Sequence, residues 1–305
     1  MIASLTTELV LDAHAELGEG PVWHPREQVL YWVDITRNQV HRLDPRSGED
    51  TVMDVGQAVG AVVPRTAGGL AVAVQDGFGL VDGDGRLTMI APVQADDPSI
   101  RMNDGKCDSQ GRFWAGTMAY DIRPGGGALY RLNPDHSVHT MLTGVTISNG
   151  LEWTDDDRTM YYIDSLDGHG TDHLSLGVDA FDFDAATGSM ANRRRVAEVP
   201  NDLTAPTGFI APDGMTLDSQ GHLWVAVHGA GEVRRFDPAG TLVGVVELPV
   251  LGVTSVAFGG DDLADLYVTT NTTFPAGDAR AHPNEGGIFR CRPGVRGRPA
   301  NMFAG

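Results

Sequence analysis

Short apolar runs of about five residues recur along the chain, and each is bounded by Gly, Pro, Asp or Asn. The runs are rich in Val, Tyr, Trp and Phe and alternate in polarity, which is typical of β-strands rather than helices. Successive runs begin about 40 to 47 residues apart, with one longer interval of about 63. We call these runs anchor strands: LYWVD from Leu30, LAVAV from Leu70, FWAGT from Phe113, MYYID from Met160, LWVAV from Leu223 and LYVTT from Leu266.

Each anchor strand is followed by a second strand that ends in a polar corner, and several of these corners read LDP, LNP or FDP. Asp or Asn initiates such a turn and Pro presets its φ angle, so the corners are equivalent turns of one repeated unit. A period near 40 residues with about four strands per unit predicts an all-β fold, a six-bladed β-propeller. We expect a single domain over residues 1–305, with the N-terminal segment TELVLD joining the last blade and closing the ring.

The longest interval contains the segment LDGHGTDHLSLG, residues 166–177, which we interpret as an insertion between two strands of blade four. Long loops in compact domains are often functional, so a lid or rim role and plain surface decoration both remain open. His169 and His173 have a spacing that binds zinc on a helix. The surrounding Gly, Thr and Asp do not favour a helix, so we expect no zinc site there.

The composition narrows the class of partner. The formal net charge of −19 argues against nucleic acid and anionic membranes, which both require a basic surface. The two cysteines, Cys107 and Cys291, lie far apart, which fits a reduced, cytoplasmic chain better than a disulfide framework. We expect no signal peptide or membrane span, and a monomer or weak homo-oligomer.

The repeat predicts which residues face the central channel. About ten residues before the anchor strand, a Gly recurs in five of the six units, at the start of the expected innermost strand. The residue before it is often a carboxylate or an amide, and equivalent positions on a ring converge near its axis. We therefore expect Glu19, Asn149 and Asp213, with Asn103 or Asp104, to converge. The alternative is that each side chain caps its own local turn.

Oxygen donors gathered without basic partners are typical ligands of hard cations, so the pattern predicts a metal site in the channel. Asn149-Gly150 would ordinarily indicate a hairpin turn. Here the acidic stretch TDDD supplies the turn, so we interpret Asn149 as a metal ligand. Asp104 is a candidate for orienting a ligand, and Asp164 and His228 are further candidates for facing the channel. We expect Cys107 to be a buried, apolar-type side chain.

Several blocks in a fixed order resemble the regucalcin (senescence marker protein)–gluconolactonase family of lactone hydrolases. They are LGEGPVWHP, LYWVDI, RMNDGKCDSQGRFWAGTM, GALYRL, ISNGLEW, YYIDS, VDAFDFD and PDGMTLDSQGHLWVA. The resemblance spans nearly the whole chain and implies a six-bladed propeller that holds one divalent cation at the channel mouth. It assigns the ligands to Glu19, Asn149 and Asp213, the same positions that the repeat phase selects.

The resemblance also implies that Arg101 and Asn103 contact the substrate. A further substrate contact in some members is a Glu shortly after GTMA, and here the sequence reads GTMAYD, so Asp121 is our candidate for that role. This departure leaves the identity of the sugar open.

The implied activity is metal-dependent hydrolysis of a sugar lactone to its aldonic acid. Asp213 is the candidate for accepting a proton from the attacking water, and activation of the water by the cation without a separate base is the alternative. All-oxygen ligands favour Ca²⁺, and Mg²⁺, Mn²⁺, Zn²⁺ and Fe²⁺ remain open. The absence of a G-x-S-x-G motif argues against a serine esterase. A phosphotriesterase-like hydrolase and a non-catalytic calcium-binding propeller are the alternatives.

Overall fold

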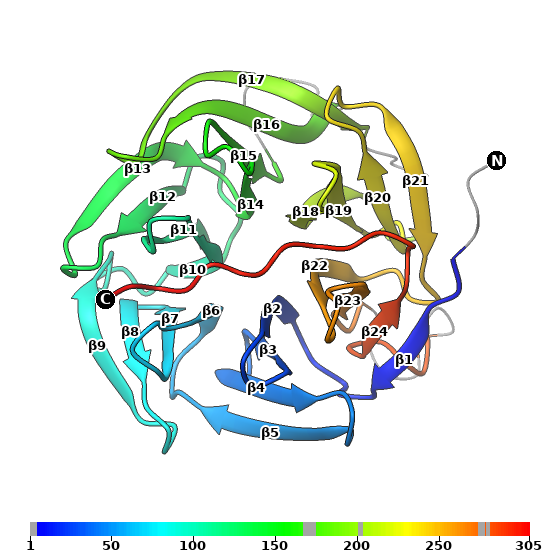
Figure 1. Ribbon diagram of the computed structural model, residues 1–305, viewed down its shortest axis with the longest axis horizontal. Coiled ribbons are helices and arrows are strands. Elements are labelled where there is room, and N and C mark those ends of the chain that lie inside the picture. The colour runs from blue at the N-terminus through cyan, green and yellow to red at the C-terminus, as the bar shows by residue number, and fades with distance from the viewer. Residues whose placement is uncertain (1–4, 167–174, 201–203, 274–277, 279–280) are drawn as a thin grey trace.

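Six four-stranded antiparallel sheets form a closed ring of blades in the computed structural model (Figure 1). The structure describes residues 5–166, 175–200, 204–273, 278 and 281–305. The six-bladed propeller expected from the repeat is therefore confirmed. The expected insertion, residues 166–177, falls between the second and third strands of blade four, but its last three residues already belong to the third strand. Most of the remainder, with His169 and His173, lies outside the described residues.

The blades are numbered along the chain, and each runs from the innermost strand to the outermost one. Blade one contains β2 (Gly18–His24), β3 (Val29–Asp34), β4 (Gln39–Asp44) and β5 (Glu49–Asp54). Blade two contains β6 (Val59–Pro64), β7 (Leu70–Val74), β8 (Gly77–Val81) and β9 (Leu87–Pro92). Blade three contains β10 (Ile100–Cys107), β11 (Phe113–Ala119), β12 (Gly127–Leu132) and β13 (Val138–Val145).

Blade four contains β14 (Ser148–Trp153), β15 (Thr159–Asp164), β16 (Ser175–Asp184) and β17 (Ser189–Pro200). Blade five contains β18 (Ala211–Leu217), β19 (Leu223–His228), β20 (Glu232–Phe236) and β21 (Leu242–Glu247). Blade six contains β22 (Val253–Gly259), β23 (Asp265–Thr270), β24 (Ile288–Cys291) and the N-terminal strand β1 (Glu8–Leu11). Because β1 pairs antiparallel with β24, the N-terminal segment closes the ring as expected.

The hydrophobic core lies between the blades. Each of the six clusters of buried apolar side chains contains residues from two neighbouring blades, so the ring is held together by packing of sheet against sheet. The anchor strands supply much of this core. For example, Trp32 of β3 and Tyr267 of β23 are fully buried in the cluster between blades one and six.

The innermost strand of every blade has a register irregularity near its start. The recurring glycines lie at or beside these irregularities, where neighbouring strands come very close. A Cβ atom at Gly60 would lie 2.2 Å from the carbonyl oxygen of Asn103, and one at Gly150 would lie 2.8 Å from that of Asp213. Glycine is required there because the adjacent backbone occupies the space of a side chain.

A C-terminal strap, residues 296–305, crosses the centre of the ring (Figure 1). It passes the turns between the first and second strands of five blades. Its backbone or side chains bond to Leu263 of blade six, Ser219 of blade five, Trp153 of blade four, Gly111 of blade three and Pro64 of blade two. The strap therefore lies at the end of the channel where the inner strands finish.

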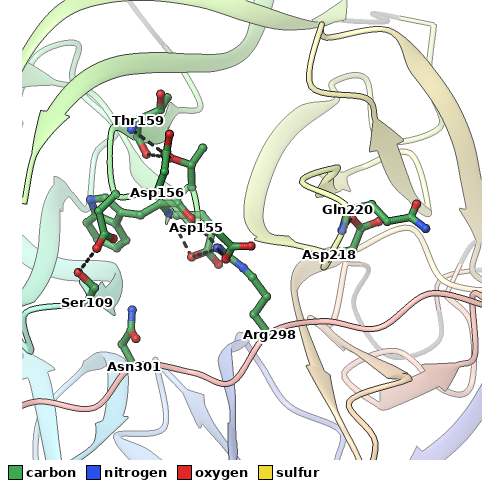
Figure 2. A network of polar contacts seen from close by, with 12 residues as sticks. Ser109, Asp155, Asp156, Thr159, Asp218, Gln220, Arg298 and Asn301 are labelled. Atoms are coloured by element: carbon green, nitrogen blue, oxygen red, sulfur yellow. Dashed lines mark hydrogen bonds and ion pairs between the residues drawn. The ribbon is translucent and has the colours of Figure 1, made fainter.

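Figure 2 shows Arg298 of the strap beside Asp155 of blade four, with Asn301 farther along the strap. The Arg298 guanidinium forms ion pairs with Asp155 and Glu152 and donates to the carbonyl oxygen of Trp153 at 2.6 Å. These contacts fasten the strap to blade four. No helix within the described ranges is long and apolar enough to cross a membrane.

Candidate functional site

The three expected ligands lie at the starts of inner strands in three blades. Glu19 is on β2, Asn149 on β14 and Asp213 on β18. Glu19 and Asn149 are buried, and Asp213 is partly exposed. The Glu19 and Asp213 carboxyl groups act on each other's pKa, so they lie close together although they are far apart in sequence. The structure therefore brings the two carboxylates together at the end of the channel opposite the strap.

Arg101 and Asn103 of β10 link Asn149 to this cluster. Nη1 of Arg101 donates to Oδ1 of Asn103 at 2.6 Å, and Nδ2 of Asn103 donates to Oδ1 of Asn149 at 2.7 Å. The Arg101 charge acts on both Glu19 and Asp213. All five residues thus belong to one connected group of polar side chains.

Three acidic side chains, Glu19, Asp104 and Asp213, gather in this group. Burial, together with repulsion from Asp104, raises the pKa of Glu19 to about 8, although the backbone N–H of Gly20 and the charge of Arg101 oppose the shift. Burial, with repulsion from Glu19 and Asp104, holds the pKa of Asp213 well above its usual range. Asp104 also has a raised pKa because of its burial. The Lys106 ammonium acts on Asp104, which leaves the Arg101 guanidinium as the positive charge that acts on both Glu19 and Asp213, so these two carboxylates with the Asn149 amide fit a divalent cation.

The amide of Asn149 is a required member of such a site. In the described ranges, three or more His, Cys, Asp or Glu side chains nowhere gather into a group that could hold a metal ion by themselves. Two carboxylates and an amide would supply oxygen ligands, which suit hard cations better than zinc sites rich in Cys or His.

Two buried aspartates position the loops that precede the ligand-bearing strands. Both carboxylate oxygens of Asp164 accept backbone N–H groups, from Thr146 at 3.0 Å and Ile147 at 2.9 Å. Asp34 does the same in blade one. The contacts of Asp164 thus place it behind Asn149 as a support for its loop. Asp34 could have been found from the sequence, because YWVD and YYID share one position in the repeat.

A second set of charges continues from Asp104 toward the strap. Nζ of Lys106 lies 3.0 Å from Oε2 of Glu152 and donates to the carbonyl oxygen of Met215 at 2.9 Å. Burial alone would raise the pKa of Glu152, but Lys106 and Arg298 hold it below its usual value. These residues line a cavity of about 420 Å³ under the strap, and Asp104 forms part of its wall. Sequence reasoning missed Lys106, although it follows Asp104 by two residues on the same strand.

The mouth of the channel carries an aromatic ring. The guanidinium carbon of Arg101 lies 5.9 Å from the centroid of the Tyr120 ring, and the Tyr120 hydroxyl donates to Oε1 of Gln75. Asp121 is exposed, and its carboxylate pairs with Arg123 at 3.0 Å. Its role in substrate binding stays a prediction.

The remaining sequence candidates lie outside the cluster. His228 ends β19, and burial lowers its pKa despite a hydrogen bond with Asn271. Cys107 is buried, and burial raises the pKa of its thiol well above the usual value, so it behaves as an apolar side chain. Cys107 and Cys291 are both free thiols, and they lie in different clusters of the core.

Residues 17–272 match the family described as the SMP-30/Gluconolactonase/LRE-like region, a span that includes every candidate ligand. The chain belongs to this family. Among curated relatives, regucalcin from Xenopus laevis is 39% identical over 313 residues and regucalcin from Homo sapiens is 37% identical over 314. Both matches cover 100% of this chain and 100% of the relative. The family resemblance drawn from the sequence is therefore confirmed.

Solved structures of the family agree with the fold. A luciferin-regenerating enzyme has a TM-score of 0.86 and 31% identity, covering 99% of this chain and 100% of its own. Regucalcin from Agrobacterium tumefaciens, described as a calcium-binding protein, has a TM-score of 0.88, 26% identity and 99% coverage of both chains. A gluconolactonase from Xanthomonas campestris, with a TM-score of 0.73 and 21% identity over 94% of this chain and 89% of its own, supports the fold alone.

Proposed function

We propose that this protein is a divalent-cation-dependent lactonase that hydrolyses a sugar lactone to its aldonic acid. The observation that carries the proposal is the connected group formed by Glu19, Asn149, Asp213, Arg101 and Asn103 at the channel mouth. Membership of a family that includes gluconolactonases supports it. A site that only bound a cation would not need a guanidinium and an amide beside it.

Glu19, Asn149 and Asp213 would hold the cation, with Ca²⁺ favoured by the oxygen-only donors. When bound, the cation supplies a positive charge that polarises the ester carbonyl and stabilises the oxyanion of the tetrahedral intermediate. No second metal is required by this arrangement.

Arg101 and Asn103 would orient the substrate. A guanidinium has five N–H donors, and the hydrogen bonds described for Arg101 use only Nη1, which leaves donors for hydroxyl groups of a sugar. Tyr120 covers one face of the guanidinium and so restricts how it can move. Holding several hydroxyls fixes the ester carbonyl against the attacking water, and such positioning supplies a large share of the rate gain.

Asp213 is our candidate for the proton acceptor. Its carboxylate has two oxygens, so it can serve as a ligand and also take a proton from the attacking water. A water activated by the cation without a separate base is the alternative. Asp213→Asn keeps a ligand oxygen and removes the base, so a variant that binds the cation but does not turn over substrate would support Asp213 as the base.

The test is hydrolysis of γ- and δ-aldonolactones by chelator-treated protein in a pH-indicator assay. Ca²⁺, Mg²⁺, Mn²⁺, Zn²⁺ and Fe²⁺ (the last anaerobically) are added back singly, and the spontaneous rate is subtracted. We expect turnover that one or more cations restore, and we expect Asn149→Ala and Asp213→Ala to abolish it while the far-ultraviolet circular dichroism is unchanged. Near-normal turnover by either variant would contradict the site assignment.

A non-catalytic calcium-binding protein is the second candidate, because a similar solved structure is described as calcium-binding. Tight Ca²⁺ binding with no turnover of any lactone or phosphorus ester would favour it. Turnover of phosphorus esters alone would favour a phosphotriesterase. The two free, buried cysteines suit a reduced compartment, so we propose a cytoplasmic protein that acts on a small molecule.

A further inference from the structure

A chain of short hydrogen bonds runs through blades three, four and five behind the candidate ligands. Arg101 donates to Asn103 at 2.6 Å, Asn103 donates to Asn149 at 2.7 Å, and Nδ2 of Asn149 donates to Oγ of Ser165 at 2.6 Å. Ser165 in turn donates to the carbonyl oxygen of Pro212 at 2.6 Å. The chain ends one residue before Asp213, and its four side chains are all buried.

Backbone carbonyls fix the direction of this chain at two points. The carbonyl oxygen of Pro212 can only accept, so the single proton of the Ser165 hydroxyl must point to it. Ser165 can then only accept from Asn149, which must present its NH₂ group and not its oxygen. Similarly, Asn103 donates to the carbonyl oxygen of Ser148 at 2.8 Å, so its NH₂ group faces blade four.

The consequence concerns the ligand atom of Asn149. An asparagine side chain has an oxygen on one side and an NH₂ group on the other, and only the oxygen can bind a cation. Because the NH₂ group of Asn149 is taken by Ser165, its Oδ1 atom is turned toward Asn103 and the group of candidate ligands. Without the Ser165 hydroxyl, the NH₂ group of Asn149 loses its acceptor, and only the hydrogen bond from Asn103 still holds the amide in this orientation.

We propose that Ser165 is a positioning residue of the cation site, which sets the Asn149 amide with its oxygen toward the cation and ties blade four to the strand of Asp213. The inference rests on the proposed function only in taking this group for a cation site. Ser165 directly follows Asp164, whose carboxylate holds the loop before Asn149. One short segment therefore sets both the backbone and the side chain of this ligand.

The test measures Ca²⁺ affinity by calorimetric titration of chelator-treated, full-length protein. We expect Ser165→Ala to raise the Kd by about 10- to 100-fold, as is typical when a residue that orients a metal ligand is lost. Ser165→Thr keeps the hydroxyl and should restore affinity to within a few-fold of the wild type. Ser165→Cys keeps the approximate volume with a weak hydrogen-bonding group and should lose affinity as Ser165→Ala does, so it gives the answer if the alanine variant does not fold.

Tyr162→Phe is the matched control. It removes a buried hydroxyl from the same blade, one that donates to Oγ of Ser148 at 2.8 Å and takes no part in the chain. Its Kd for Ca²⁺ should equal that of the wild type. If folded Ser165→Ala and Ser165→Cys bind Ca²⁺ within twofold of a wild type that binds it, the positioning role is wrong and the proposed function stands. If the wild type binds none of the divalent cations used in the lactone assay, both the positioning role and the proposed function fail.

Discussion

The substitution Phe303→Ala should measure how much the C-terminal strap contributes to the stability of the propeller. The Phe303 side chain is fully buried in the core between blades two and three, and its ring centroid lies 6.5 Å from that of Phe113. Its backbone N–H donates to the carbonyl oxygen of Pro64 at the end of β6, and its carbonyl oxygen accepts from the N–H of Thr66 in the turn that follows. The substitution Phe303→Ala removes the ring and leaves these backbone bonds available.

The expected loss follows from the burial of this ring. Replacing a buried Phe by Ala typically destabilises a protein by about 3–5 kcal/mol, because apolar contacts are lost and a cavity remains. The entropy of unfolding is about 2.1 cal/mol/K per residue. A chain of 305 residues therefore has about 0.6 kcal/mol/K, and Tm should fall by about 5–8 °C.

Differential scanning calorimetry and urea unfolding give the two readouts. Asn301→Ala is the matched control on the same strap, because it removes one exposed side chain whose amide donates to the carbonyl oxygen of Cys107 at 3.3 Å. It should change the free energy of unfolding by less than about 0.5 kcal/mol. A Tm for Phe303→Ala within 1 °C of the wild type would refute the packing of the strap. An equal loss of stability in both variants would show that the aromatic side chain of Phe303 contributes nothing specific.

Three further predictions concern Gly150, Asp164 and His228. Gly150→Ala should lower stability by about 1–3 kcal/mol and weaken cation binding, because the added methyl group would lie 2.8 Å from the carbonyl oxygen of Asp213. Urea unfolding and calcium titration would measure both effects, with Gly83→Ala, which has open space, as the control. Asp164→Asn should lower stability by about 1–3 kcal/mol in urea unfolding, because one of two backbone N–H groups loses its acceptor. Burial lowers the pKa of His228 below its usual 6.5, so the folded protein binds this proton less readily than the unfolded chain does. Stability from this group is present above pH 6.5 and is lost below it, so Tm should fall more steeply from pH 7 to pH 5 in the wild type than in His228→Gln.

Each of these predictions has a result that contradicts it. Equal stability of Gly150→Ala and Gly83→Ala would mean that the inner strands are not in close contact. An unchanged urea midpoint for Asp164→Asn would show that its backbone contacts contribute nothing. Parallel curves of Tm against pH for the wild type and His228→Gln would show that His228 titrates normally.

Much of the candidate site could be predicted from the sequence because the fold repeats. In a ring of equivalent blades, the position of a residue within its repeat predicts its distance from the axis. Glu19, Asn149 and Asp213 share a position, and the structure places all three at the starts of inner strands. The recurring glycines mark the same position in the repeat, because the close contact of neighbouring inner strands requires glycine there.

The supports of the site could not be predicted, because they depend on contacts between distant residues. Ser165 bonds to Asn149 and to Pro212, 16 and 47 positions away, and no local pattern distinguishes its hydroxyl from any other at the end of a strand. The strap is a more extreme case, since Arg298 meets Asp155 across 143 positions. The roles of the 166–177 insertion and of Asp121 stay predictions, because local sequence patterns do not determine where loop side chains lie relative to the site.

The most direct test of the account is the location of the cation in a crystal. Chelator-treated protein would be crystallised with Mn²⁺, and anomalous difference density would be measured at the manganese absorption edge. The account predicts one strong peak at the channel mouth, about 2.0–2.6 Å from oxygens of Glu19, Asn149 and Asp213. A manganese peak at another place, or no peak in a protein that Mn²⁺ activates, would contradict the claim that Glu19, Asn149 and Asp213 hold the cation.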